Sequence, residues 1–216
     1  MKNCILFSTF CNDKRLNNRV NDWLNKNGKN RCIAVIPSFW SATTYEYPPM
    51  AAANMGFKEY LVVPVGENFN RKRWEMALTC DTIYLSGGNT PEFWTMLHLR
   101  GLDKDLIEFA NHGLLMGMSA GIHIMSPTIE LSLVADGNYL GLSGDELNSL
   151  GLVDFLVKPH ADAWMYYEEL FRNYATKYGK PVYMIKDGQA VWACDHGIRE
   201  YGGTVTKFYP YRKVPK

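Results

Sequence analysis

The fold is decided by one segment of the sequence: Gly113-Leu-Leu-Met-Gly-Met-Ser-Ala-Gly-Ile-His-Ile-Met125. Its apolar run at 114–116 is typical of a buried strand, and the run stops at a glycine. The next five residues, Gly117-Met-Ser-Ala-Gly121, have the G-x-S-x-G spacing of a nucleophile elbow. In such an elbow a strand turns sharply into a helix, and glycines are needed because a Cβ would collide with neighbouring backbone. The segment therefore predicts a strand, a tight turn and a helix, with Ser119 lifted clear of the sheet.

The elbow has two interpretations, because glycine, serine and alanine are also common in turns without chemistry. In the first, Ser119 is a nucleophile, and the free N–H groups at the start of the following helix face the group that it attacks. The N–H of Ala120 would then be one donor of an oxyanion hole. In the second, the segment is a small-residue turn between a buried strand and a helix. The motif alone leaves both open.

Apolar runs of strand length alternate with helical segments on both sides of the elbow. This alternation predicts a parallel sheet covered by helices on both faces. No repeat, linker or low-complexity segment divides the pattern, so we expect a single domain over residues 1–216. The loop at 38–49 is long, and we expect it to border the site. We expect strands at 5–8, 32–36, 61–63, 82–85, 152–157 and 182–185, short antiparallel strands within 189–209, and helices near 13–27, 50–55, 71–78, 91–99, 103–111 and 164–178.

The composition argues against several classes of protein. The formal net charge is +1, which gives no sign of a nucleic-acid or membrane partner. The longest weakly polar run, at 114–125, is too short to span a bilayer, and a buried strand explains the apolar start of the chain better than a signal peptide does. Five cysteines without C-x-x-C or Cys/His metal spacing favour reduced thiols in the cytoplasm. We expect no metal or organic cofactor.

A second glycine-rich turn follows the expected strand at 82–85. Its sequence is Ser86-Gly-Gly-Asn-Thr-Pro91, in which we expect Thr90 to cap a helix that starts at the proline. One interpretation makes the Gly88 N–H the second oxyanion donor, and the other is a plain strand-to-helix turn. Ligands of open α/β sheets bind at the carboxyl ends of the strands, and we expect both Gly88 and Ser119 at that edge.

A catalytic serine needs a neighbouring base, which is nearly always a histidine. We choose His160, because it follows an apolar strand and a proline and is therefore expected at the same edge as Ser119. The alternative is an ordinary loop histidine. The other four histidines are expected on helices before the elbow, behind the elbow or in a turn: His98, His112, His123 and His196.

The base in turn needs an acid that orients it. We prefer Asp187, which ends a strand and precedes a glycine, with Asp136 in the loop between Ser119 and His160 as the runner-up. An aspartate before a glycine is also a common turn residue, so neither choice excludes that explanation. Asp162 lies too close to His160 in the sequence to be the first choice, but we expect it to line the site.

Six pieces of sequence follow one another in order: Leu85-Ser-Gly-Gly-Asn-Thr90, Gly117-Met-Ser-Ala-Gly121, Ser126-Pro-Thr-Ile129, Leu150-Gly-Leu152, Pro159-His160 and Lys186-Asp-Gly188. Together they resemble the peptidase E (aspartyl dipeptidase) and cyanophycinase family of serine peptidases, over roughly residues 1–205. The resemblance implies a three-layer α/β/α sandwich with a mostly parallel central sheet, related to class I glutamine amidotransferases, with serine in place of their cysteine.

The resemblance also assigns roles to residues. It implies a triad of Ser119, His160 and Asp187, with oxyanion N–H groups on Gly88 and Ala120. The substrate-binding candidates are Asn89 and Thr90 in the glycine-rich turn, Asp162, and Arg172. Family members with aspartyl specificity carry an arginine-containing stretch after the histidine, whereas residues 161–171 hold no arginine here.

The departure after the histidine bears on specificity. Arg172 is the nearest arginine to His160, and its alternative explanation is a helix-surface residue. Asp162 beside the base would repel an acidic substrate side chain rather than attract it. A preference for N-terminal aspartate is therefore not expected to carry over with the catalytic residues.

The sequence thus predicts a cytoplasmic serine peptidase that hydrolyses short peptides, dipeptides among them. A second hypothesis is an α/β-hydrolase esterase that uses Ser119, Asp187 and His196 in that chain order. A third is a non-catalytic binding or regulatory protein that kept the fold. The oligomeric state is left open, with a homodimer as one option.

Overall fold

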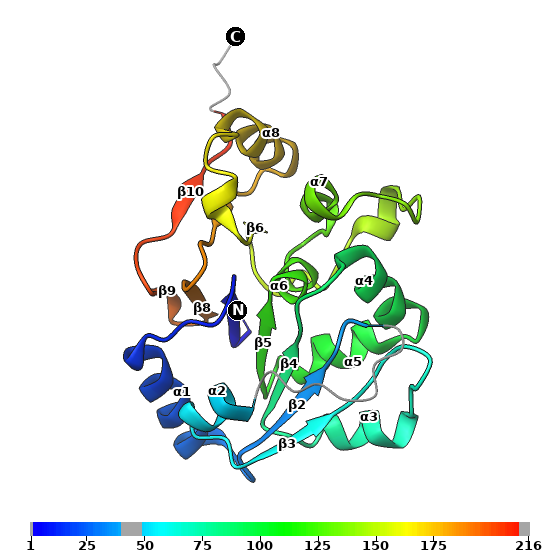
Figure 1. Cartoon of the computed structure of the whole chain (residues 1–216), viewed down its shortest axis with the longest axis vertical. Helices are drawn as coiled ribbons and strands as arrows, with labels where there is room; N and C mark the ends of the chain where they lie inside the picture. Colours follow the sequence, from blue (N-terminus) through cyan, green and yellow to red (C-terminus); the bar gives the residue numbers. More distant parts are fainter. Residues whose placement is uncertain (1, 40–48, 212–216) are drawn as a thin grey trace.

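The computed structural model describes residues 2–39 and 49–211, and its largest feature is a central sheet (Figure 1). Within these residues, seven strands form the sheet in the order β3-β2-β4-β5-β1-β8-β9. Neighbouring strands from β3 to β1 pair in parallel, whereas β8 and β9 are added through antiparallel pairing. The strands are β1 (Cys4–Phe7), β2 (Cys32–Ile36), β3 (Glu59–Val62), β4 (Thr82–Leu85), β5 (Leu114–Met118), β8 (Ala190–Cys194) and β9 (Gly197–Tyr201).

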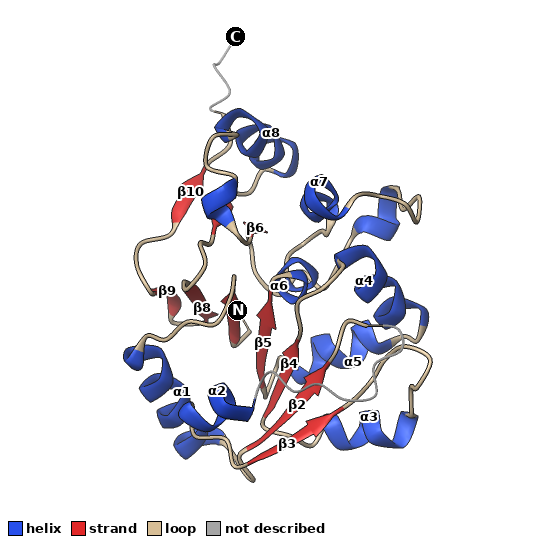
Figure 2. Ribbon diagram, in the orientation of Figure 1, coloured by secondary structure: helices blue, strands red, loops and turns tan. Residues whose placement is uncertain are grey.

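Helices cover both faces of this sheet (Figure 2). Successive side chains of a strand point to opposite faces, so Ile5 and Leu6 of β1 belong to different apolar clusters. The cluster of Ile5 includes residues of α1 (Lys14–Asn27) and α2 (Pro49–Asn54). The cluster of Leu6 includes residues of α3 (Arg71–Ala77), α4 (Thr90–Leu99), α5 (Leu102–Phe109) and α6 (Ala120–Met125). The predicted α/β fold with a mostly parallel sheet between two helical layers is confirmed.

A second, smaller sheet lies beyond the carboxyl ends of the parallel strands (Figure 1). Its strands are β10 (Thr206–Phe208), β7 (Val182–Met184) and β6 (Leu156–Lys158), in that order. Phe171 of α8 (Glu168–Tyr178) packs with Val182 and Phe208 in a separate apolar cluster on this sheet. Because β6 also packs against α6, the small sheet is held next to the segment that carries Ser119.

The strand expected at 152–157 is shorter than predicted and is β6. The residues before it are hydrogen-bonded to the end of α6 instead of to a sheet. The N–H of Leu152 donates to the carbonyl of Met125 over 3.0 Å, and the N–H of Leu150 donates to that of Ile124 over 3.0 Å. An apolar run reports burial, and here a helix end supplies the acceptors that a neighbouring strand would have supplied.

The helix expected at 164–178 begins later, at Glu168, and is α8. The chain before it forms a short 3-10 helix, η3 (Ala161–Ala163), followed by a turn in which the Tyr167 N–H donates to the Trp164 carbonyl. Aromatic residues in that turn fitted the helical pattern but do not belong to the helix. Three further short elements lie between α6 and β6, where the sequence analysis expected neither a helix nor a strand before residue 152: η1 (Glu130–Ser132), α7 (Leu133–Asp136) and η2 (Gly144–Leu147).

The predicted strand, turn and helix around Ser119 are present as β5 and α6. A Cβ on Gly121 would lie 2.4 Å from the carbonyl oxygen of Leu85 in β4, and one on Gly117 would lie 2.8 Å from the backbone of Gly121. The N–H of Gly121 donates to the Ser86 carbonyl over 3.1 Å. The start of α6 therefore packs directly on backbone, which only glycine allows at these positions.

Behind Ser119, α6 carries a fully enclosed histidine. His123 is 3% exposed, and its Nδ1 has no hydrogen-bond partner among the described residues. Burial lowers the pKa of His123 from 6.5 to about 3, and the nearby charges of Lys158 and His160 act in the same direction. His123 is therefore neutral in the folded protein, as a core residue.

Two further findings concern the expectations about compartment and membrane. All five cysteines are buried, and none forms a disulfide. Over the ranges 2–39 and 49–211, no helix combines the length and the apolar character that a bilayer span requires. Most of the long loop expected to border the site, residues 40–48, lies outside the described residues.

We predict that Gly121→Ala destabilises the protein by about 3 kcal/mol, because its Cβ would press on backbone that has no free volume to move into. The matched control is Gly179→Ala at the end of α8, where φ is +64° and nothing lies within 4 Å of the added Cβ. That control should cost only about 1 kcal/mol of backbone strain. Urea unfolding measures both, and an equal or smaller loss for Gly121→Ala would contradict the packing argument.

We also predict that His123 makes the protein acid-sensitive. Its folded pKa of about 3 lies below the unfolded value of 6.5, so the unfolded chain binds an extra proton between these values. The stability contribution of neutral His123 is complete above pH 6.5 and is lost as the pH falls. Between pH 7 and 5, the wild type should lose about 2 kcal/mol more unfolding free energy than His123→Leu does.

The measurement is urea unfolding at both pH values, and the comparison of slopes removes any packing effect that is independent of pH. His112→Gln replaces an exposed histidine and should keep the wild-type pH dependence. Equal losses for the wild type and His123→Leu would show that His123 does not carry the effect.

Candidate active site

Ser119 occupies the turn between β5 and α6 in a strained backbone conformation. Its φ is 50° and its ψ is −106°, and among the described residues only two others outside glycine have positive φ. Such conformations typically cost about 1–3 kcal/mol each and persist only where the surroundings hold them. The Ser119 N–H donates to the carbonyl of Phe7 at the end of β1 over 3.0 Å. The side chain thus stands at the carboxyl edge of the sheet.

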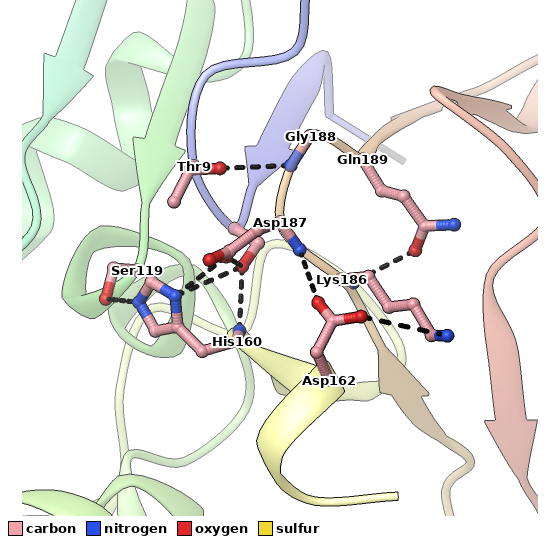
Figure 3. Close-up of polar contacts among 9 residues, drawn as sticks. Thr9, Ser119, His160, Asp162, Lys186, Asp187, Gly188 and Gln189 are labelled. Carbon is pink, nitrogen blue, oxygen red and sulfur yellow. Dashed lines mark hydrogen bonds and ion pairs between the residues drawn. The ribbon is translucent and has the colours of Figure 1, made fainter.

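His160 faces Ser119 from the second sheet. It follows β6 and Pro159, has a φ of 54°, and places its Nε2 2.9 Å from the Oγ of Ser119 (Figure 3). The two residues are 41 positions apart in the sequence and meet because β6 packs against α6. The structure thus brings the predicted nucleophile and base within hydrogen-bond distance.

Asp187 completes a continuous chain of hydrogen bonds. It follows β7, and its Oδ1 lies 2.8 Å from the Nδ1 of His160. Because a carboxylate accepts hydrogen bonds, we assign the ring proton to Nδ1, which leaves Nε2 free to accept the hydroxyl proton of Ser119. The side chains of His160 and Asp187 are 44% and 53% exposed, so burial does not hold them in place.

Residues at the end of β1 complete this arrangement, and the sequence analysis did not single them out. The Ser8 hydroxyl donates to Oδ1 of Asp187 over 2.6 Å and accepts from the N–H of His160 over 2.7 Å. The Thr9 hydroxyl oxygen accepts from the N–H of Gly188 over 3.0 Å (Figure 3). Ser8 is the last residue of the first expected strand and Thr9 follows it, at the edge where Ser119 was expected, and this position was the available signal.

Asp162 contacts the turn that carries Asp187. Its Oδ2 accepts from the Asp187 N–H over 3.1 Å, and its Oδ1 lies 3.8 Å from the Nζ of Lys186 (Figure 3). The side chain of Gln189 closes the same turn by accepting from the N–H of Lys186 over 2.9 Å. Asp162 therefore holds the backbone of Asp187 in place, a contact that its expected substrate-binding role did not include.

Asp136, the runner-up acid, lies elsewhere. It ends α7, and its Oδ2 accepts from the backbone N–H of Thr90 at the start of α4 over 3.1 Å. The carboxylate next to the His160 ring is that of Asp187. The structure thus brings Asp187, and not Asp136, into the group with Ser119, and Asp136 instead places its negative charge at a helix N-terminus.

The second glycine-rich turn lies against Ser119. A Cβ on Gly87 would be 3.2 Å from the Cβ of Ser119. Gly88 is exposed with a φ of +145°, and a Cβ there would be 2.0 Å from the Oγ of Ser38. The Ser38 hydroxyl fixes the turn by donating to the Gly87 carbonyl over 2.5 Å. Ser119 is thus flanked by this turn and by Ala120, whose N–H lies in the first turn of α6, where helical N–H groups lack intrahelical acceptors.

The expected cap of α4 is corrected by one residue. Asn89 is the N-cap, and its side chain accepts from the N–H of Glu92 over 3.0 Å, while Thr90 is buried and is the first residue of the helix. Asparagine caps a helix better than threonine does, because its amide oxygen reaches the N–H groups of the first turn. The expected substrate-binding pair therefore has structural contacts of its own.

Arg172 lies on α8 and has other partners. Its Nε is 2.6 Å from Oε1 of Glu168, its Nη1 donates to the Tyr209 carbonyl over 3.4 Å, and its guanidinium lies 5.5 Å from the ring centroid of Phe208. None of these contacts involves Ser119, His160 or Asp187. The geometry matches the helix-surface interpretation of this arginine.

His196 lies at the other end of the strands from Ser119, beyond their amino ends in the parallel part of the sheet. In β1, Phe7 is opposite Met118 of β5 and also opposite Ala190 of β8, so the start of β8 lies at the Ser119 edge. His196 follows the other end of β8, in the turn before β9. The esterase grouping of Ser119, Asp187 and His196 is therefore wrong.

Lys158 is a buried cation near the base that the sequence analysis missed. It ends β6, is 2% exposed, and holds its ammonium 4.2 Å from the ring centroid of Trp164. Burial lowers the pKa of Lys158 from 10.5 to about 8. A lysine directly before a Pro-His pair at a strand end was the only signal in the sequence.

Among the described residues, no cluster of three or more His, Cys, Asp or Glu side chains has the geometry of a metal site.

Comparison with known proteins places this geometry in a family. The model of peptidase family S51 matches residues 7–201. An uncharacterized peptidase of Listeria monocytogenes serovar 1/2a is 33% identical over 115 residues. That alignment covers 52% of this chain and 56% of the relative, so the chain spans little more than half of that relative's length.

Two solved structures share the fold. A protein proposed to be a peptidase E, from Listeria monocytogenes EGD-e, is 24% identical, with a TM-score of 0.65 over 93% of this chain and 98% of its own. A peptidase from an acI-B1 actinobacterium is 13% identical, with a TM-score of 0.55 over 99% of this chain and 96% of its own. At these identities the likeness concerns the fold. The family match over most of the length shows that the chain belongs to peptidase family S51, a family of serine peptidases.

Proposed function

We propose that this chain hydrolyses short peptides through a triad of Ser119, His160 and Asp187. The observation that carries the proposal is one line of hydrogen bonds at the sheet edge of a family S51 member. Ser119 Oγ lies 2.9 Å from His160 Nε2, and His160 Nδ1 lies 2.8 Å from Asp187 Oδ1. A nucleophile within reach of a base that is itself oriented by an acid is the arrangement that acyl transfer by serine requires.

In this mechanism, Ser119 Oγ attacks the carbonyl carbon of the scissile peptide bond while His160 Nε2 accepts the hydroxyl proton. The resulting imidazolium is stabilised by Asp187 and then gives its proton to the leaving amine, which departs from the tetrahedral intermediate. A water molecule, activated by the same imidazole, hydrolyses the acyl-enzyme and restores Ser119.

The N–H groups of Gly88 and Ala120 would hold the oxyanion of the tetrahedral intermediate. Support comes from their positions, because the Gly87-Gly88 turn and the first turn of α6 flank Ser119 from two sides. Loss of one such donor typically raises the barrier by about 3 kcal/mol. The positive φ of Gly88 and its contact with Ser38 favour glycine at this position. A backbone donor that must approach the reacting atoms closely is also best supplied by glycine, which has no Cβ.

The specificity that we propose is for short peptides without a requirement for an acidic residue. Arg172 was the candidate for gripping a carboxylate, but its guanidinium is engaged by Glu168 and by the Tyr209 carbonyl on the surface of α8. Asp162 adds negative charge next to Asp187 and would oppose an acidic side chain nearby. The buried free thiols favour a reducing compartment, and we propose the cytoplasm.

We predict that a mixed library of dipeptides and tripeptides is cleaved by the wild type and that Ser119→Ala or His160→Ala lowers kcat by a factor on the order of 10⁶. Asp187→Ala should lower kcat by about 10⁴-fold, because the imidazole keeps its place but loses its orienting acid. His196→Ala is the matched histidine control and should retain activity. Cleavage that survives Ser119→Ala, or a wild type that cleaves no peptide, would contradict the proposal.

We further predict that Arg172→Ala changes kcat/KM for peptides with an N-terminal aspartate by less than about threefold, which corresponds to less than 0.7 kcal/mol. Lys177→Ala is the control, because it also removes a cation of α8 that is paired, here with Glu130. Kinetics on paired substrates, such as Asp-Leu and Ala-Leu, give the readout. A loss confined to the acidic substrate in Arg172→Ala would restore the specificity role that its contacts argue against.

A further inference from the structure

The proposed acid and base lie in an open part of the site, and this openness raises the question of what orients them. The Asp187 side chain is 53% exposed and that of His160 is 44% exposed. Packing does not restrain an exposed carboxylate. Such a group is therefore free to rotate unless hydrogen bonds hold it. One fully buried polar side chain, that of Ser8, lies directly behind both groups.

We infer that Ser8 is a positioning residue of the catalytic group, whose single hydroxyl fixes both the acid and the base. The inference rests on the proposed role of Ser119, His160 and Asp187 and adds a residue to it. Ser8 does not touch Ser119 or the position of a scissile bond through any contact in the described residues, so its effect on the reaction is exerted through its two partners.

The hydrogen-bond inventory of one hydroxyl accounts for every contact. A serine hydroxyl has one proton to donate and two lone pairs. The proton goes to Asp187 Oδ1 at 2.6 Å, and one lone pair accepts the backbone N–H of His160 at 2.7 Å. The ring Nδ1 of His160 lies 3.5 Å from Ser8 Oγ, at the limit of a hydrogen bond, and 2.8 Å from the same Asp187 Oδ1. Oδ1 of Asp187 therefore receives both protons and cannot rotate away without losing both.

The backbone contact has a separate purpose. His160 has a φ of 54°, the left-handed region that a side chain with a Cβ adopts at a cost of about 1–2 kcal/mol. This conformation directs the imidazole toward Ser119, and it needs surroundings that hold it. The Ser8 oxygen provides one such restraint, because this buried side chain accepts the N–H of the strained residue over 2.7 Å.

Ser8 also joins the acid and base to the strand that positions the nucleophile. The carbonyl of the preceding residue, Phe7, accepts the N–H of Ser119 over 3.0 Å. Phe7 at the end of β1 thus contacts Ser119, and the next residue, Ser8, contacts both His160 and Asp187. A shift of this segment would move Ser119 relative to His160 and Asp187, and a misplacement of about 1 Å can cost about 10²-fold in rate.

The test compares Ser8→Ala, which removes the hydroxyl, with Ser8→Cys, which keeps a weaker donor and acceptor. Ser132→Ala is the matched control, because Ser132 is equally buried and its hydroxyl has no partner in the described residues. We expect Ser8→Ala to lower kcat by about 10²-fold with KM changed less than about threefold, Ser8→Cys to fall between it and the wild type, and Ser132→Ala to stay within about twofold.

A double-mutant cycle separates positioning from general structural damage. In the Asp187→Ala background the proton of Ser8 has lost its acceptor, so adding Ser8→Ala should lower kcat by less than about tenfold further. A full multiplication of the two losses would overturn the inference, as would a Ser8→Ala variant with wild-type kcat. Thermal unfolding of each variant shows whether a loss of kcat comes from an unfolded protein. If Ser8→Ala does not fold, the kcat of Ser8→Cys still tests the inference.

A measurement without substrate keeps this inference apart from the proposed function. The His160 Nδ1 proton, held between ring and carboxylate, should give a low-field proton NMR signal in the wild type and in Ser132→Ala. The signal should be lost or shifted in Ser8→Ala. If the signal behaves this way but no peptide is cleaved, the proposed function fails and the positioning role stands. If Ser119-dependent cleavage is found and Ser8→Ala leaves both kcat and the signal unchanged, only the positioning role fails.

Discussion

The hydrogen bond from the Ser119 N–H to the Phe7 carbonyl is the interaction on which the arrangement of the site depends. It fixes the end of β5 against the end of β1, two strands that are more than 100 residues apart in the chain. Parallel pairing carries every strand of this part of the sheet to the same edge, so the strand ends converge there without any further device. The second sheet then needs only to deliver His160 and Asp187 to that edge.

Two of the three described non-glycine residues with positive φ are residues of the candidate site that face each other. Ser119 and His160 both have positive φ, and each is restrained by a hydrogen bond to residues at the end of β1. The close packing of Gly117 and Gly121 on backbone allows the first of these conformations, because α6 can start immediately after the turn. The surrounding structure holds both residues in these strained conformations, as is usual for strained residues at functional sites.

The parts of the fold that depend on local pattern could be predicted, and the parts that depend on tertiary partners could not. The strand ending at Gly117 and the turn at Ser119 follow from periodicity and glycine spacing. The start of β6 could not be read from its apolar run, because the Met125 carbonyl at the end of α6 takes the N–H of Leu152. A run of apolar residues encodes burial and does not encode which backbone provides the hydrogen bonds.

The same distinction applies to the candidate site. His160 and Asp187 could be placed at strand ends, because the chain position of a residue after an apolar run indicates the edge. Ser8 could not be recognised as their partner, because its contact with Asp187 spans 179 residues and joins two sheets. Arg172 shows the converse, since proximity to His160 in sequence suggested a role that its ion pair with Glu168 does not support.

Environment, and not distance along the chain, separates the two histidines near Ser119. His123 lies one helical turn behind Ser119, but burial lowers its pKa to about 3, so it is too weak a base to take up a proton near neutral pH. The buried Lys158 reinforces this effect, since its positive charge disfavours a second cation behind the turn. His160 instead has both ring nitrogens in hydrogen bonds and half of its side chain in solvent. Of these two histidines, His160 is therefore the one placed to accept the proton of Ser119 in the proposed reaction.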